Sequence, residues 1–108
     1  MSNTILAQNA IAGEKLVLNW LTENTFTDMV KEDFGVDEKV IIATGTLENI
    51  LIRVKTVVYS QIPFKLSEYE INQITKMASG LNKKAYVAYV IIDADKNLIG
   101  EIKWKRLD

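Results

Sequence analysis

Apolar residues recur along the chain with two different spacings, one helical and one alternating. From Asn3 to Glu23 the apolar side chains fall on one face of a helix, and Asn24 is its predicted stop. Gly13 lies in the middle of this face, although glycine inside a helix costs roughly 1 kcal/mol relative to alanine. We therefore interpret Gly13 as a position where the helix packs closely on a sheet.

Three extended segments follow the first helix. Residues 25–34, TFTDMVKEDF, alternate loosely, and residues 39–46, KVIIATGT, form a short β-branched run. Residues 50–59, ILIRVKTVVY, predict a long central strand. The turn sequence TGTLEN between the last two segments indicates a hairpin, so these two strands are predicted to be antiparallel.

A second helix is marked by its cap. In FKLSEYEINQITKMASGLN, residues 64–82, Ser67 is followed three residues later by Glu70. This spacing is that of a capping box, in which the two side chains satisfy each other's backbone N–H groups. Gly80 is predicted to end the helix in a left-handed conformation.

The C-terminal part of the chain is extended again. AYVAYVIID, residues 85–93, is almost continuously apolar, which is typical of a strand covered on both faces. LIGEIKWKRL, residues 98–107, alternates and carries lysines, a common protection for an edge strand. The order α-β-β-β-α-β-β predicts a single α+β (mixed α/β) domain over residues 1–108, with a central mixed sheet and flanking helices.

Composition limits the chemistry. The 108 residues include no cysteine and no histidine, which excludes thiolate catalysis, the serine–histidine triad and the usual zinc sites. Any metal would be a hard cation held by oxygen. The net charge of −1 argues against a strongly basic nucleic-acid coat. The lack of cysteine, of an N-terminal signal pattern and of a long apolar run predicts a cytoplasmic protein without a membrane partner.

Two cations lie side by side on the central strand. Arg53 and Lys55 are two residues apart, so their side chains point to the same face of an otherwise apolar strand. Two like charges there require a counter-charge. Glu14, another acid or a bound phosphate could provide it.

The ordered segments AGEKLVLNWL, KVIIAT, LIRVKT and FKLSEYEINQI resemble the restriction-endonuclease-like fold, the PD-(D/E)XK nuclease superfamily. VKT…PFKLSEYE is also similar to an uncharacterised nuclease-like domain of bacterial defence-associated proteins. The resemblance implies a first helix with Glu14, a second strand over residues 39–44 and a third strand that ends in Lys55.

In that superfamily an aspartate on the second strand, and a glutamate and a lysine on the third, assemble a magnesium site that activates water against a phosphodiester. Lys55 matches the lysine and Glu14 the auxiliary acid of the helix. Arg53 stands in place of the glutamate and Val40 in place of the aspartate. The resemblance therefore implies a degenerate active site, in a chain that is a binding or structural module and a possible homodimer.

Three alternatives remain open at this stage. Displaced acids, Asp37, Glu14 and Glu68, could assemble with Lys55 as a catalytic site for an active Mg²⁺-dependent nuclease. Arg53 and Lys55 could instead bind phosphate or nucleic acid without cleavage, since a guanidinium holds phosphate in a bidentate manner. In a purely structural version, Arg53 pairs with Glu14.

Overall fold

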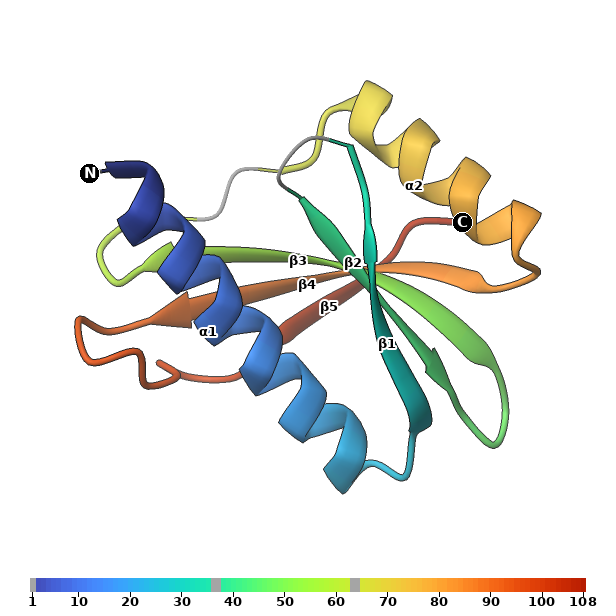
Figure 1. Cartoon of the computed structure of the whole chain (residues 1–108), viewed down its shortest axis with the longest axis horizontal. Coiled ribbons are helices and arrows are strands. Elements are labelled where there is room, and N and C mark those ends of the chain that lie inside the picture. The colour runs from blue at the N-terminus through green and yellow to red at the C-terminus, as the bar shows by residue number, and fades with distance from the viewer. Residues whose placement is uncertain (1, 36–37, 63–64) are drawn as a thin grey trace.

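The order of helices and strands is the one that the sequence predicts (Figure 1). A computed structural model of the chain describes residues 2–35, 38–62 and 65–108. The elements are α1 (Ser2–Glu23), β1 (Thr27–Asp33), β2 (Lys39–Thr44), β3 (Asn49–Val58), α2 (Glu68–Gly80), β4 (Lys84–Ile92) and β5 (Lys103–Arg106). Within the described residues, no helix has both the length and the apolar character needed to cross a membrane.

The five strands form one mixed sheet in the order β1-β2-β3-β4-β5. β2 is antiparallel to both of its neighbours, β1 and β3, which confirms the predicted hairpin between β2 and β3. β4 lies parallel to β3, and β5 lies antiparallel to β4. The parallel pair requires a crossover connection, and α2 lies within it.

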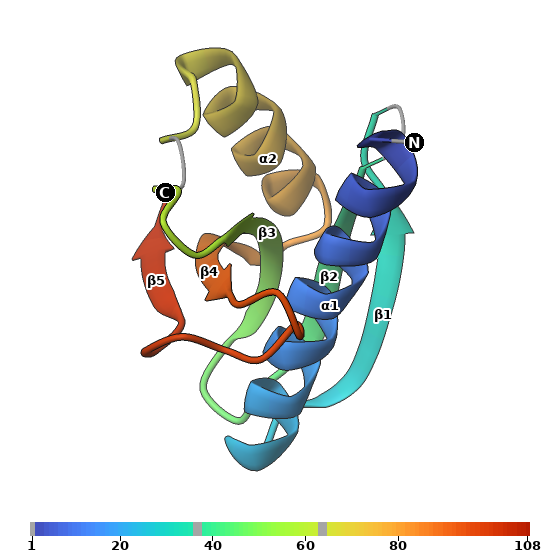
Figure 2. The same cartoon turned by 90° about the vertical axis from the view of Figure 1, so that its left-hand side faces the viewer.

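The two helices cover opposite faces of the sheet, as Figures 1 and 2 show together. Because side chains alternate along a strand, the three central strands β2, β3 and β4 contribute to both cores. The α1 face buries a larger cluster, which includes Val17, Leu21, Ile41, Ala43, Ile50, Ile52, Val54, Ala88, Val90 and Ile92. The α2 face buries a smaller one, which includes Val40, Leu51, Leu66, Ile74, Ala78, Ala85 and Val87.

α1 approaches the sheet closely at Gly13. A Cβ atom added there would lie 1.8 Å from the Oγ1 atom of Thr56 in β3. The predicted close packing of Gly13 is thus confirmed. α1 ends at the predicted residue, since the side-chain amide of Asn24 donates a hydrogen bond to the carbonyl oxygen of Trp20 at 2.8 Å.

α2 begins as predicted but ends differently. Ser67 and Glu70 form the complete capping box, with the Glu70 N–H donating to Ser67 Oγ at 3.1 Å. The prediction that Gly80 adopts the left-handed stop is wrong, because Gly80 is the last helical residue. Asn82 takes the positive φ of 58° instead, and the Lys83 N–H closes the helix on the Ala78 carbonyl at 2.8 Å.

β4 is covered on both faces along only part of its length. Toward α2, Ala85 and Val87 are fully buried, whereas Tyr89 and Ile91 are half-buried. The prediction of a strand covered on both faces is therefore wrong for the second half of β4. The apolar cluster under α2 includes Ala85 and Val87, has Tyr89 at its margin and does not reach Ile91, so the end of the second half is open.

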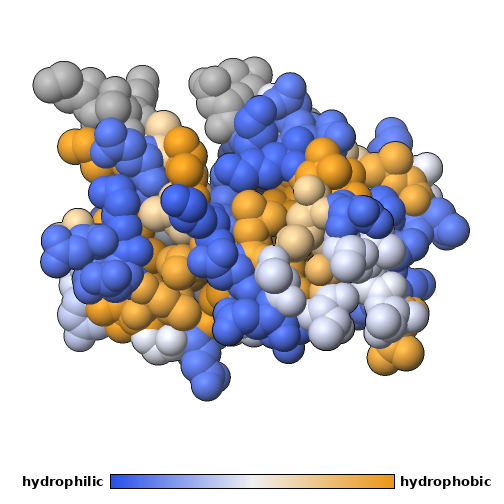
Figure 3. All heavy atoms as spheres, turned by 60° about the horizontal axis from the view of Figure 1, so that its bottom comes forward, coloured by the Kyte–Doolittle hydropathy of each residue, from blue (hydrophilic) through white to orange (hydrophobic). Residues whose placement is uncertain are grey.

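β5 is shorter than the predicted strand. Gly100, with a φ of 70°, interrupts residues 98–107, and the strand proper covers four residues. Trp104 points into the α1 core and packs against Trp20 in a tilted arrangement, with ring centroids 4.7 Å apart. Elsewhere on the surface, apolar side chains form patches between hydrophilic ones on the face that Figure 3 shows.

Candidate functional site

Arg53 and Lys55 project from β3 toward the α2 face, as their spacing predicts. Val40 of β2 is paired directly with Arg53 in the sheet, and it lies in the core of the α2 face. The two positions that the resemblance assigns to metal-binding carboxylates are therefore neighbours in space. They hold a valine and an arginine.

Arg53 is buried, with 9% of its surface exposed. Its Nη2 atom lies 3.1 Å from Glu38 Oε1, and its Nη1 atom donates to the carbonyl oxygen of Val54 at 2.7 Å. Its Nε atom is buried without a hydrogen-bond partner among the described residues. Glu38 therefore supplies the counter-charge, and the alternative in which Arg53 pairs with Glu14 is wrong.

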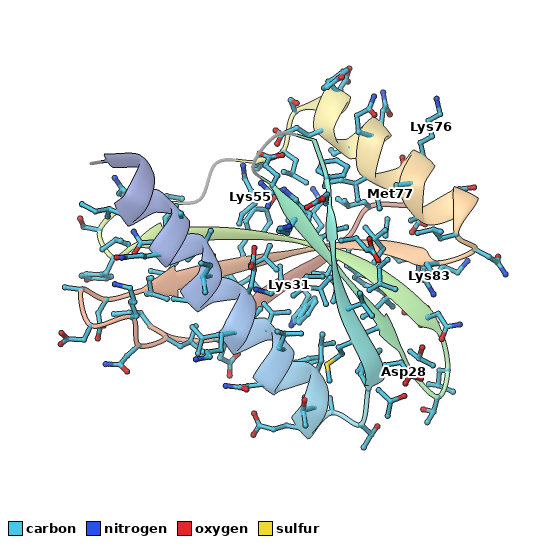
Figure 4. All side chains as sticks on the ribbon, viewed as in Figure 1. Asp28, Lys31, Lys55, Lys76, Met77 and Lys83 are labelled. Atoms are coloured by element: carbon cyan, nitrogen blue, oxygen red, sulfur yellow. The ribbon has the colours of Figure 1, made fainter. Side chains whose placement is uncertain are left out.

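Lys55 has a different acid beside it. Its Nζ atom lies 3.8 Å from Glu70 Oε2, on the first turn of α2 (Figure 4 labels Lys55). The other oxygen of Glu70 accepts from the Ser67 backbone N–H at 3.2 Å. That backbone hydrogen bond lowers the pKa of Glu70 below its usual value, and Lys55 lowers it further, although partial burial opposes both. Glu70 is thus a carboxylate with two structural roles.

Glu14 belongs to the other side of the sheet. It is 6% exposed, and its Oε1 atom lies 2.9 Å from Nζ of Lys31 in β1. Its neighbour Gly13 abuts Thr56, which faces α1, whereas the adjacent Lys55 faces α2. Figure 4 labels Lys31 and Lys55, which lie at different places on the sheet. The structure therefore brings Glu14 to Lys31 and not to Lys55.

The remaining predicted acids do not complete a site with Lys55. Glu68 is exposed on the first turn of α2 and forms no ion pair within the described ranges. Asp37 lies outside the described residues. Across residues 2–35, 38–62 and 65–108, no group of three or more acids is arranged to hold a metal ion.

The sequence-based interpretation missed Glu38 as a partner of Arg53. A signal was present, because Glu38 precedes Val40 by two residues and Val40 is paired with Arg53. Residues two apart on an extended segment point to the same side. Glu70 was recognised as a cap, but its contact with Lys55 depends on how α2 docks on the sheet.

A groove lies on the α2 face beside these residues, over the open half of β4. Its volume is about 570 Å³, and its floor is apolar. Two lysines of β5 and Lys65 contribute cations, and Glu101 contributes one acid. The lining residues are Ile62, Lys65, Tyr89, Ile91, Ile99, Gly100, Glu101, Lys103 and Lys105.

The strand pairing places residues of the groove in the same rows as the cations of β3. Lys55 pairs with Tyr89, which pairs with Lys103, so the three form one row across the sheet. Arg53, Val87 and Lys105 form the next row in the same way. In-register residues share a face. The α2 face therefore carries two cations on β3 and two on β5.

Comparison with solved structures identifies the architecture. The chain superimposes on Hjc, a Holliday junction resolvase from the archaeal hyperthermophile Archaeoglobus fulgidus, with a TM-score of 0.70. The alignment covers 91% of this chain and 72% of that chain at 20% identity. The fold is restriction-endonuclease-like. The fold expected from the four sequence segments is thus confirmed. Neither a family model nor a curated protein matches this sequence.

Proposed function

We propose that this chain is a nuclease-like domain that binds nucleic acid without cleaving it. The observation that carries the proposal is the Arg53–Glu38 ion pair, at the position where the resemblance implies a metal-binding glutamate. A guanidinium repels a divalent cation, and Val40 opposite it offers no oxygen ligand. Glu38 and Glu70 are each already engaged with a cation of the protein.

Binding is supported by the second group of cations. Lys65, Lys103 and Lys105 surround the groove, and none of them forms an ion pair within the described part of the chain. Such amino groups attract phosphate and release its counterions on binding. Hjc, which shares the fold, is a Holliday junction resolvase, and this supports nucleic acid as the class of partner.

The absence of cleavage is tested on labelled single-stranded DNA, duplex DNA and RNA with added Mg²⁺ or Mn²⁺. We expect every substrate to remain at full length. Metal-dependent cleavage that is lost in Lys55→Ala and kept in Lys76→Ala would overturn the proposal. That result would favour an active nuclease in which Asp37, Glu14 and Glu68 supply displaced ligands.

Binding is tested by fluorescence anisotropy at low salt, with charge reversal at Lys103 and Lys105. We expect Lys103→Glu/Lys105→Glu to abolish binding and the matched Lys76→Glu/Lys83→Glu variant to retain it. Figure 4 shows Lys76 and Lys83 away from Lys55, on α2 and just after it. Glutamates on β5 would still protect an edge strand from pairing, so a loss of binding reports phosphate recognition. Equal binding by both variants would contradict the proposal.

A further inference from the structure

We infer that the groove over Tyr89 holds an unpaired base, so that the domain prefers single-stranded nucleic acid to duplex. This inference rests on the proposed function and specifies its ligand. The floor of the groove combines the half-buried Tyr89, which packs at the margin of the apolar cluster under α2, with Ile91 and Ile99, which lie outside that cluster. A phosphate backbone alone would leave this apolar floor open to water. A planar base fills it.

The cations are arranged for a backbone that runs beside the base. Lys103 and Lys105 are two residues apart on β5, which places their attachment points roughly 7 Å apart along the strand. Lys65 lies on the connection that precedes α2, and it lines the same groove. Among the described residues that line the groove, Glu101 is the one acid, so these residues carry three positive charges against one negative charge.

Single strands and duplexes differ in whether their bases can reach this surface. In a duplex the bases are stacked and paired, so only phosphates reach the lysines. In a single strand the bases can turn outward onto aromatic side chains, with the backbone following a basic groove. Tyr89 lies in register with Lys103, so a base on the ring and a phosphate on the amino group occupy one row. The geometry therefore couples stacking to phosphate binding.

The test compares an unstructured oligothymidylate with a duplex of the same length, bound to the full chain at one salt concentration. We expect tighter binding of the oligothymidylate. Tyr89→Leu, which keeps apolar volume but removes the ring, should weaken single-strand binding about tenfold and leave duplex binding unchanged. Tyr89→Phe should bind like the unmodified chain. Tyr69→Leu, at a tyrosine that is 72% exposed on α2, is the matched control.

A measurement without substitution covers the case in which Tyr89→Leu does not fold. Irradiation of the complex with an oligothymidylate that carries photoreactive thymines should crosslink the peptide containing Tyr89. Crosslinks confined to α2, or equal affinity for single strand and duplex, would overturn the inference and leave the proposed function intact. Binding of polyglutamate as tight as that of oligothymidylate would overturn the inference in favour of an acidic peptide. No binding of any nucleic acid would reject the proposed function itself.

Discussion

Arg53 shows how a single buried cation is held in this sheet. Two nitrogens of its guanidinium have partners: Nη2 contacts the Glu38 carboxylate, and Nη1 donates to the Val54 carbonyl oxygen. Both contacts are made on the face of the sheet that α2 covers. A buried charge left without its partner costs several times more than an exposed one. Glu38 therefore matters more to stability than its place before β2 suggests.

The first prediction concerns this pair. Glu38→Ala should lower the free energy of unfolding by about 1 to 2 kcal/mol, less than for a fully buried pair because Glu38 remains partly exposed. Urea unfolding followed by circular dichroism measures the change. Asp33→Ala, which breaks the exposed pair between Asp33 and Lys39, is the control and should change little.

A double substitution separates the pair from other effects. If Arg53→Met is combined with Glu38→Ala, the loss should be smaller than the sum of the two single losses, because no unpaired charge remains. Strict additivity of the two substitutions would contradict the role assigned to Glu38.

At the scale of elements, sequence predicts most where the cause is local. The capping box of α2 needs only Ser67 and Glu70, and both behave as predicted. The predicted end of α2 is wrong because Gly80 and Asn82 can each adopt a left-handed conformation, and Asn82 is the one that does so. The Lys55–Glu70 contact also depends on docking, so the sequence could not indicate it.

The second prediction uses the two roles of Glu70. Ser67→Ala should cost about 1 kcal/mol at neutral pH through loss of the cap. Glu70→Gln keeps the capping geometry, since glutamine also serves in a capping box, but removes the charge beside Lys55. We therefore expect Glu70→Gln to be the milder substitution at neutral pH.

Acid separates the two variants further. Because the pKa of Glu70 is lowered in the folded chain, its ionised form stabilises the fold above its ordinary pKa, and this contribution disappears as the pH falls through the lowered value. Unfolding measured between about pH 6 and pH 3 should show a shallower acid loss in Glu70→Gln than in the unmodified chain. An identical acid dependence would contradict this assignment.

At the scale of the whole molecule, the groove follows from two lengths. α2 has 13 residues and β4 has 9, which correspond to about 20 Å of helix and about 30 Å of strand. One helix of this length leaves part of the strand uncovered. Both segments were predicted from sequence at nearly these lengths, so the open half of β4 could have been foreseen, whereas which half α2 covers depends on tertiary packing.

The third prediction concerns the distribution of charge. The net charge is −1, yet the groove gathers three lysines. If Lys103 contacts a phosphate, Lys103→Ala should reduce the slope of log affinity against log salt by about one, and Lys105→Ala should do the same. Lys76→Ala should leave the slope unchanged. Anisotropy titrations over a series of salt concentrations measure these slopes.

The Arg53–Glu38 pair also bears on how such a sequence can change. Arg53→Glu alone would set a new carboxylate near Glu38 and Glu70, with Lys55 as the neighbouring cation on β3. Without a bound metal these acids would repel one another, so this step toward metal chemistry would weaken the fold before any ligand compensated it. Val40→Asp would in turn place a charge in an apolar core. Each of these single substitutions is therefore expected to destabilise the fold before it could help to bind a metal ion.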